Sequence, residues 1–193
     1  DKPIFTAGNY TPELAEETLA NGDADIIMFG RQLIADPDTA NKLLEGKDED
    51  VRPCLSCNQI CVGRLYQDRV ISCAINNQAV FENEYILNKT EEPKNVVIIG
   101  GGPGGLEAAR VAALKGHNAT LYEKTDNLGG QLIAAGAPIF KQRIRKFLQW
   151  QKVQVEKLGV KVVLNKTIDL NSPELENADR IIVAVGASPL KLN

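Results

Sequence analysis

Two apolar runs of strand length mark the first fifty residues. They cover Pro3–Ala7 and Ala24–Phe29, and each closes on a glycine. Both runs are continuous rather than alternating, so we expect two strands that are buried on both faces. Such strands, separated by a helical pattern, are typical of a parallel sheet.

Helical patterns follow both strands. One helix is expected to begin after Thr11, a capping residue followed by Pro12, and to end at Asn21-Gly22. Another is expected to begin at Asp36-Pro37-Asp38. Their inner faces are assigned to Leu14, Thr18 and Leu19 in the first helix and to Leu43 and Leu44 in the second. The region predicts two βα units, and since two parallel strands cannot close a barrel, we expect them to belong to a longer (β/α) protein.

The second half of the chain repeats this alternation with longer helices. Its most apolar strand is expected at Asn95–Ile99, directly before a glycine-rich turn. Helices are expected at 106–115 and 138–158, and further strands at 119–122, 160–164 and 181–185. The pattern predicts a Rossmann-like domain, preceded by a polar linker that ends near Glu92.

Composition narrows the class of protein. The 193 residues are 44% hydrophobic and carry a net charge of −3, which argues against a nucleic-acid partner. No apolar run has the length of a membrane span. The single histidine excludes any mechanism that needs paired histidines from this polypeptide. Cysteines without a targeting signal indicate a reducing cytoplasm.

All four cysteines fall within twenty residues, at Cys54, Cys57, Cys61 and Cys73. Disulfides are disfavoured because the chain shows no secretory signal and is long enough for a full core. Zinc is one alternative, although its usual layout is two separated CxxC pairs. Three ligands in one short loop and a fourth from elsewhere is typical of an iron–sulfur cluster. The spacing favours iron–sulfur, with zinc and unligated thiols left open.

The glycine-rich turn satisfies the G-x-G-x-x-G pattern. Gly100 makes the tight turn, Gly102 allows backbone to approach a pyrophosphate, and Gly105 allows the helix to pack closely on the strand. Glu123 follows the next strand, where a ribose-binding carboxylate belongs. With a strand before it and a helix after it, the turn predicts dinucleotide binding.

Two further groups of glycines are candidates for cofactor contact. Gly129 and Gly130, followed by Gln131, offer a second close backbone approach that suits a long ligand such as FAD. Gly8 and Gly30-Arg31 close the first two strands, and the loops after a barrel's last two strands commonly bind phosphate. The alternative, that these last are ordinary turn glycines, stays open.

Together these features resemble one family. The key feature is the segment GR-x-L-I-A-D-P, residues 30–37, followed by the cysteine spacing C-x2-C-x3-C-x11-C. It resembles the iron–sulfur flavoenzymes of the old yellow enzyme class. These are NADH:flavin oxidoreductases typified by 2,4-dienoyl-CoA reductase, enoate reductase and trimethylamine dehydrogenase. The resemblance implies an α/β chain in three parts. Residues 1–50 would be the last two βα units of an FMN-binding TIM barrel, residues 51–92 a [4Fe–4S] segment and linker, and residues 93–193 a partial Rossmann-like FAD-binding domain without its nicotinamide domain.

The same resemblance assigns site residues. Gly30 and Arg31, with Gly8, would contact the FMN phosphate at a site that this chain leaves incomplete. The four cysteines would ligate the cluster, which favours iron over zinc. The residues around the FAD, or an ADP in its place, would be Gly100, Gly102, Gly105, Glu123, Gly129, Gly130, Gln131 and Gly186. Two positions depart from the family pattern, Asn77 where a proline is usual and Val185 where a threonine is usual.

The implied activity is electron transfer from NAD(P)H through FAD and the cluster to FMN, for reduction of an enoyl-CoA or enoate C=C bond. No catalytic residue is assigned, because the family's substrate-protonating residues lie in earlier barrel strands. Three alternatives remain: a binding module for FAD or ADP without catalysis, an amine dehydrogenase type with redox-inert ADP, and a small subunit that docks onto a separate barrel chain. The rest of the barrel is thus expected in cis or in trans.

Overall fold

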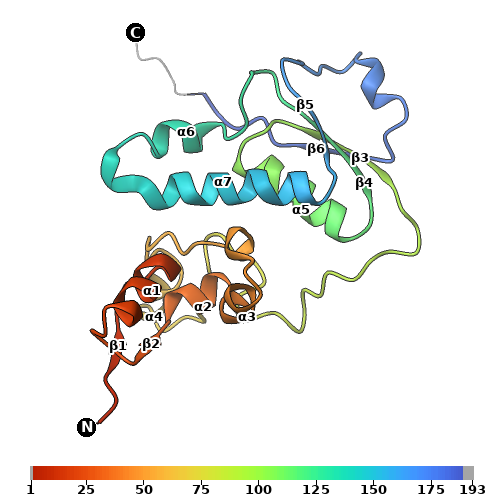
Figure 1. Ribbon diagram of the computed structural model, residues 1–193. Helices are drawn as coiled ribbons and strands as arrows, with labels where there is room; N and C mark the ends of the chain where they lie inside the picture. The colour runs from red at the N-terminus through yellow and green to blue at the C-terminus, as the bar shows by residue number, and fades with distance from the viewer. Residues whose placement is uncertain (1, 189–193) are drawn as a thin grey trace. The chain divides into compact units, whose positions relative to one another are not determined.

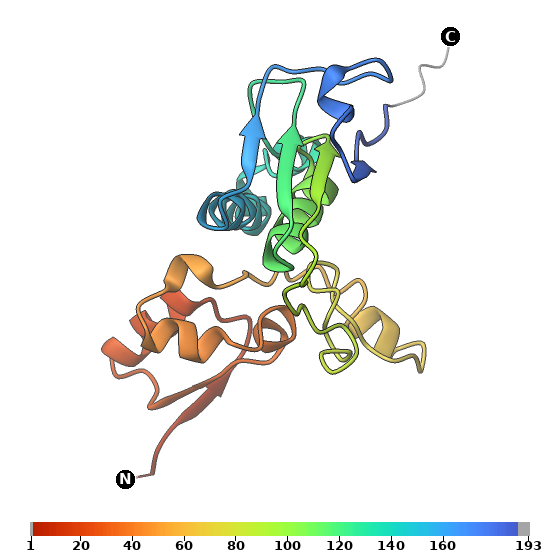
Figure 2. The same cartoon turned by 90° about the vertical axis from the view of Figure 1, so that its right-hand side faces the viewer.

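The computed structural model describes residues 2–188 and divides into two compact units, 1–86 and 87–193 (Figures 1 and 2). Both units combine helices with parallel strands, which confirms the predicted α/β class. Among the described residues no helix is long and apolar enough to cross a membrane.

The first unit contains one two-stranded parallel sheet. Its strands are paired from Phe5–Ile26 to Ala7–Met28, so the loops that follow them lie next to each other. The elements in chain order are β1 (Phe5–Ala7), α1 (Pro12–Ala20), β2 (Ile26–Met28), α2 (Arg31–Ala35), α3 (Thr39–Leu44), a 3-10 turn (Asp48–Asp50) and α4 (Val62–Leu65). The short helix α2, directly after β2, was not predicted.

The expectation of two fully buried strands is wrong for this chain. Phe5 is 56% exposed, and Ile26 and Met28 are 41% and 47% exposed. A parallel strand needs cover on both faces, and the described elements of the first unit do not provide it for these side chains.

The termini of α1 agree with the prediction, but its inner face does not. The Thr11 hydroxyl accepts a hydrogen bond from the backbone N–H of Leu14 at 3.3 Å, and the helix ends at Asn21 before Gly22. Leu14 and Leu19 are exposed, and the buried residue is Ala15. The apolar spacing thus predicted the helix correctly, but not the face of the helix that packs against the rest of the unit.

In α3 the predicted inner face is right for Leu43, which is partly buried, and wrong for Leu44. Leu44 is 87% exposed, whereas Thr39 is completely buried. Thr39 and Leu43 are four residues apart and share one helix face, while Leu44 lies about 100° away from it.

The second unit is a four-stranded parallel sheet in the order β5-β4-β3-β6. Its elements are β3 (Asn95–Ile99), α5 (Pro103–Leu114), β4 (Asn118–Tyr122), α6 (Gln131–Ala135), a 3-10 turn (Ile139–Lys141), α7 (Gln142–Lys157), β5 (Lys161–Val163), a 3-10 turn (Pro173–Leu175) and β6 (Arg180–Val183). All four predicted strands are present. The short helix α6 was not predicted.

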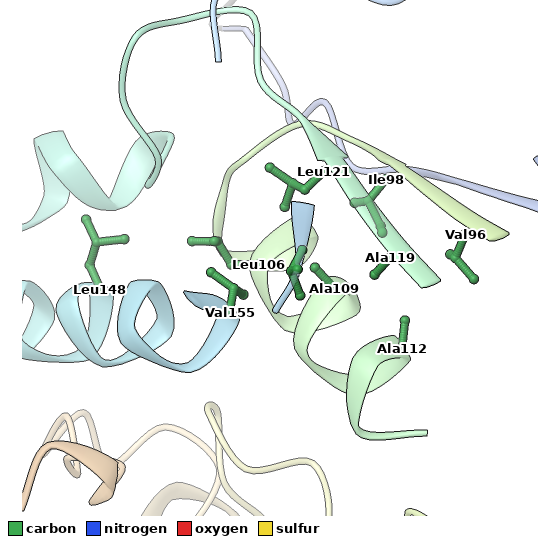
Figure 3. Packing of buried hydrophobic residues seen from close by; sticks show 10 residues of the cluster. Val96, Ile98, Leu106, Ala109, Ala112, Ala119, Leu121, Leu148 and Val155 are labelled. Carbon is green, nitrogen blue, oxygen red and sulfur yellow. The ribbon is translucent and has the colours of Figure 1, made fainter. Parts of the chain in front are cut away.

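The core of this unit joins α5 and α7 to the central strands. Leu106, Ala109 and Ala112 of α5 face Ile98 and Leu121 (Figure 3). From α7, Leu148 and Val155 complete the same cluster. The small residues of α5 allow this helix to lie close to the strands, which positions its N-terminus at the end of β3.

Both long helices differ at their start from the prediction. The helix α5 begins at Pro103 rather than at Leu106, so Gly104 and Gly105 belong to its first turn. The helix α7 begins at Gln142 rather than at Pro138, and Phe140, expected on the inner face, is 81% exposed. The residues before Gln142 form a 3-10 turn that carries Phe140 away from the core.

Candidate functional site

The glycine-rich turn after β3 has no room for side chains. Gly100 has a φ of +107°, and a Cβ there would lie 2.4 Å from the carbonyl oxygen of Ala184. A Cβ at Gly105 would lie 1.8 Å from the carbonyl oxygen of Gly100. The turn therefore needs glycine at both positions, as a dinucleotide-binding turn does.

The second pair of glycines packs directly against this turn. The backbone N–H of Gly129 donates to the carbonyl oxygen of Gly101 at 2.8 Å, and a Cβ at Gly130 would lie 3.0 Å from the Cα of Gly102. Gly129 itself has a φ of +131°. The structure thus brings both glycine groups together and gives the second pair a packing role.

The end of β6 lies beside the same glycines. The Gln131 side chain donates to the carbonyl oxygen of Ala187 at 2.9 Å, next to Gly186, whose φ is +72°. Gly102, Gly130, Gln131 and Gly186 are therefore gathered at the carboxyl end of the sheet, where ligands bind in open α/β folds.

Glu123 is buried beside the turn rather than open to solvent. Its carboxylate accepts hydrogen bonds from the backbone N–H of Gly101 at 2.7 Å and of Thr125 at 2.8 Å, and from the Thr125 hydroxyl. Burial raises the pKa of Glu123, but these hydrogen bonds outweigh it and hold the pKa below its usual value. The charged carboxylate fixes Gly101, and whether it also binds a ribose stays a prediction.

Gln151 is a supporting residue that the sequence did not reveal. Its side chain on α7 is 2% exposed and donates from Nε2 to the carbonyl oxygen of Pro103, at the start of α5, at 3.1 Å. A glutamine on an otherwise ordinary amphipathic helix carries no signal of this contact. It links α7 to the N-terminus of α5.

In the first unit, all four cysteines line one pocket. The cavity between them has a volume of about 20 Å3, room for about one water molecule. The apolar part of its wall is formed by Ile34, Leu55, Ile60, Ala74 and Ile75, and the polar part by Arg31, Ser56 and Asn58. Cys57 is exposed and the other three cysteines are partly buried.

Backbone N–H groups point at the thiols. The N–H of Ser56 lies 3.4 Å from the Sγ of Cys54. Burial raises the pKa of the Cys73 thiol, and negative charge on Cys54 and Cys57 raises it further. The backbone N–H groups of Ile75 and Asn76 lower this pKa, but by less. Cys73, distant in sequence, lines the same pocket as the CxxC pair.

Buried polar side chains hold the cysteine loop in place. Gln32 is 5% exposed, accepts from the backbone N–H of Cys54 at 2.9 Å, and donates to the carbonyl oxygen of Arg52 and the hydroxyl of Thr39. Asn76 donates to the carbonyl oxygen of Ile34 at 3.0 Å. These anchors were not predicted, because a single glutamine or asparagine gives no pattern.

The loops after β1 and β2 meet beside this pocket. Arg31, which follows Gly30 at the start of α2, donates to the Asn58 side chain at 2.6 Å and to the Asn9 side chain, next to Gly8, at 3.4 Å. The two predicted phosphate loops are therefore adjacent and connected to the cysteine loop. Their phosphate contact stays a prediction.

The donor chemistry of four thiols suits an iron–sulfur cluster, although the cavity between them is small in this structure. In residues 2–188, no group of three or more histidine, cysteine, aspartate or glutamate side chains is placed to hold a single metal ion. The four cysteines instead surround one pocket, with apolar walls that limit water and an N–H group at a sulfur. Shielding and such hydrogen bonds are the means by which proteins tune iron–sulfur clusters, so these residues fit that group.

Two families match the sequence in different parts of the chain. Residues 72–193, more than half of it, match the family described as "Pyridine nucleotide-disulphide oxidoreductase". Residues 1–50 match the "NADH:flavin oxidoreductase / NADH oxidase family". The parts correspond to the sheet with the glycine-rich turn and to the two βα units.

Known proteins resemble the chain along its whole length. The cinnamate reductase of Clostridium sporogenes is 43% identical over 193 residues, which are 100% of this chain and 29% of the relative. A 2-naphthoyl-CoA reductase structure matches with a TM-score of 0.94 at 33% identity. The match covers 100% of this chain and 30% of the reductase chain. The histamine dehydrogenase of Rhizobium sp. 4-9 has a TM-score of 0.89 at 25% identity, over 98% of this chain and 28% of its own.

The chain thus spans less than a third of the length of these relatives. Within that span this chain contains, in order, the two βα units, the four-cysteine pocket and the glycine-rich turn. It belongs to the pyridine nucleotide-disulphide oxidoreductase family through residues 72–193 and, taken as a whole, to the old-yellow-enzyme-like flavoenzymes.

Proposed function

We propose that this chain is the electron-transfer part of a flavin- and iron–sulfur-dependent oxidoreductase that uses NAD(P)H to reduce an activated C=C bond. The observation that carries the proposal is the pocket formed by all four cysteines, placed beside Arg31 and the two phosphate loops. The names of the cinnamate and 2-naphthoyl-CoA reductases support an enoate or enoyl-CoA substrate class. A reducing cytoplasm agrees with four free cysteines.

In the first unit, Cys54, Cys57, Cys61 and Cys73 would hold a [4Fe–4S] cluster. The apolar part of the wall shields one side of the site, and the N–H of Ser56 stabilises negative charge on the Cys54 sulfur. Gly8, Gly30 and Arg31 would contact an FMN phosphate, as part of a TIM barrel whose remaining strands are supplied in cis or in trans.

In the second unit, the turn at Gly100, Gly102 and Gly105 would bind the pyrophosphate of FAD. The N-terminus of α5 presents unpaired N–H groups and the positive end of its dipole to that anion. Glu123 would bind the ribose while it holds Gly101, and Gln131 and Gly186 would lie toward the flavin.

When bound, the two flavins would exchange electron pairs with the nicotinamide and the substrate, and the cluster would pass single electrons between the flavins. Within each unit the protein's own residues would orient these groups and shield them. The catalytic proton donor for the C=C bond is not among the residues assigned here.

The likeness to histamine dehydrogenase favours a second candidate, an amine dehydrogenase type with ADP in the FAD position and outward electron flow. A third is a module that binds FAD or ADP and transfers no electrons. Cofactor extraction separates ADP from FAD, because the released nucleotide is identified by its mass and by its flavin absorbance.

Anaerobic photoreduction tests electron transfer within the chain itself. Loss of flavin absorbance followed by loss of the broad cluster absorbance is expected if electrons pass between the two sites. Flavin reduction with no change in a cluster that is itself reducible by dithionite would reject the proposal in favour of the binding module.

A further inference from the structure

Four polar side chains connect the cysteine loop to the loops after β1 and β2. Arg31 donates from Nη1 to Oδ1 of Asn58 at 2.6 Å and from Nη2 to Oδ1 of Asn9 at 3.4 Å. The Ser56 hydroxyl donates to the same Asn9 oxygen at 2.6 Å. We call this set, Asn9, Arg31, Ser56 and Asn58, the polar bridge. It contacts the two strand ends from both sides of Cys57.

The backbone at the bridge adopts a conformation that needs support. Ser56 has a φ of 53° and Asn58 a φ of 57°, in the left-handed region that serine seldom occupies and that asparagine adopts more readily. Such residues persist where their surroundings fix them. Here both side chains are held by the bridge, and they flank Cys57, the one exposed cysteine. The bridge therefore sets the direction in which Cys57 points into the pocket.

The same guanidinium is the group that a phosphate would bind. A phosphate or FMN phosphate takes the planar fork of an arginine with two parallel hydrogen bonds. In the structure one arm of that fork is occupied by Asn58 and the other by Asn9. A phosphate on Arg31 must therefore compete with Asn58, which changes the support of the cysteine loop.

We infer that the polar bridge couples phosphate binding at Arg31 to the conformation of the four-cysteine loop, with Asn58 as the positioning residue. The inference rests on the proposed function. Coupling of this kind is reciprocal, so a ligand at the cysteines also changes the affinity of Arg31 for phosphate.

The test compares Asn58→Gly with Asn165→Gly. Glycine at 58 keeps the left-handed backbone and removes the oxygen that Arg31 binds. Asn165 has a φ of 55° in the second unit, so its replacement is the same change away from the bridge. Asn58→Asp keeps an acceptor for the guanidinium and serves as the conservative rescue.

Hydrogen exchange of residues 54–61 is measured first, on metal-free protein with and without inorganic phosphate. We expect about tenfold faster exchange in Asn58→Gly, because the loss of one hydrogen bond to a charged group changes an equilibrium by about that factor. Asn58→Asp and Asn165→Gly should exchange at the wild-type rate. Phosphate should speed exchange in the wild type and leave Asn58→Gly unchanged. Equal exchange in all proteins, or no response of the wild type to phosphate, would overturn the inference.

Reconstituted protein supplies the second readout. The cluster of Asn58→Gly should lose its iron to a chelator about tenfold faster than that of the wild type, with an altered electron paramagnetic resonance signal and unchanged unfolding of the second unit. Iron release and spectra identical to wild type would also reject the inference. Failure of the wild type to bind iron would reject the proposed function, while the exchange measurement still decides on the bridge.

Discussion

Replacing Gly105 by alanine should destabilise the second unit strongly. The new Cβ would lie 1.8 Å from the carbonyl oxygen of Gly100, whereas ordinary contacts begin at 3.4 Å. Gly100 cannot move away, because its own φ is +107° and it packs against the carbonyl of Ala184. The start of α5 must therefore shift away from β3, which opens the core at Leu106.

The size of the effect follows from two opposing terms. Forcing extra atoms into a packed site costs about 1–3 kcal/mol or more, and alanine regains up to about 1 kcal/mol as a better helix former than glycine. We expect a net loss of about 2 kcal/mol in the free energy of unfolding. For a unit of this size, that lowers the urea midpoint by roughly 1–2 M.

The matched control is Gly104→Ala. Gly104 lies in the same turn of α5, and a Cβ there meets no atom within 4 Å. The same substitution should leave stability unchanged or raise it by up to about 1 kcal/mol. Urea unfolding is followed in FAD-free protein by the fluorescence of Trp150, the single tryptophan, which is buried in α7. Equal midpoints for the two variants would refute the close contact between α5 and the turn.

Three further predictions concern charge and ligands. The folded pKa of Glu123 lies below its ordinary value of about 4.5, so its charge stabilises the fold above that pH, and this contribution is lost as the pH falls further. In Glu123→Gln the free energy of unfolding should therefore depend less on pH at the acid side, and an unchanged slope would contradict the hydrogen bond from Gly101. Arg110→Lys should cost about 1.5 kcal/mol of unfolding free energy, since the buried guanidinium makes two hydrogen bonds to Glu107, at 2.9 and 2.7 Å, that an ammonium cannot reproduce; wild-type stability in urea would argue against this pair. Cys73→Ser should lower the iron and sulfide retained without changing the unfolding of the second unit, and full retention would exclude Cys73 as a ligand.

The strands and the glycine-rich turn were predictable because short-range patterns determine them. The apolar run at Asn95–Ile99 has the length of a strand rather than of a helix, and the spacing of the glycines that follow it identifies the turn. The inner faces of α1 and α3 were not predictable, because apolar residues such as Leu14 and Leu44 are placed by neighbours that local spacing does not reveal.

The site shows the same division. The cysteine spacing indicated four side chains around one ligand, and the structure places them on one pocket. The anchors of that pocket, Gln32 and Asn58, act through contacts with residues more than twenty positions away. Single polar residues at such separation leave no periodic signal, so only the folded chain reveals them.

The central claim is that the four cysteines hold an iron–sulfur cluster in a chain that also binds FAD. The most direct measurement is the absorption spectrum of anaerobically purified protein, with iron, acid-labile sulfide and zinc determined on the same sample. The account predicts broad absorbance beneath a structured flavin band, with about four irons and four sulfides per chain. Colourless protein that carries one zinc and no sulfide would contradict it.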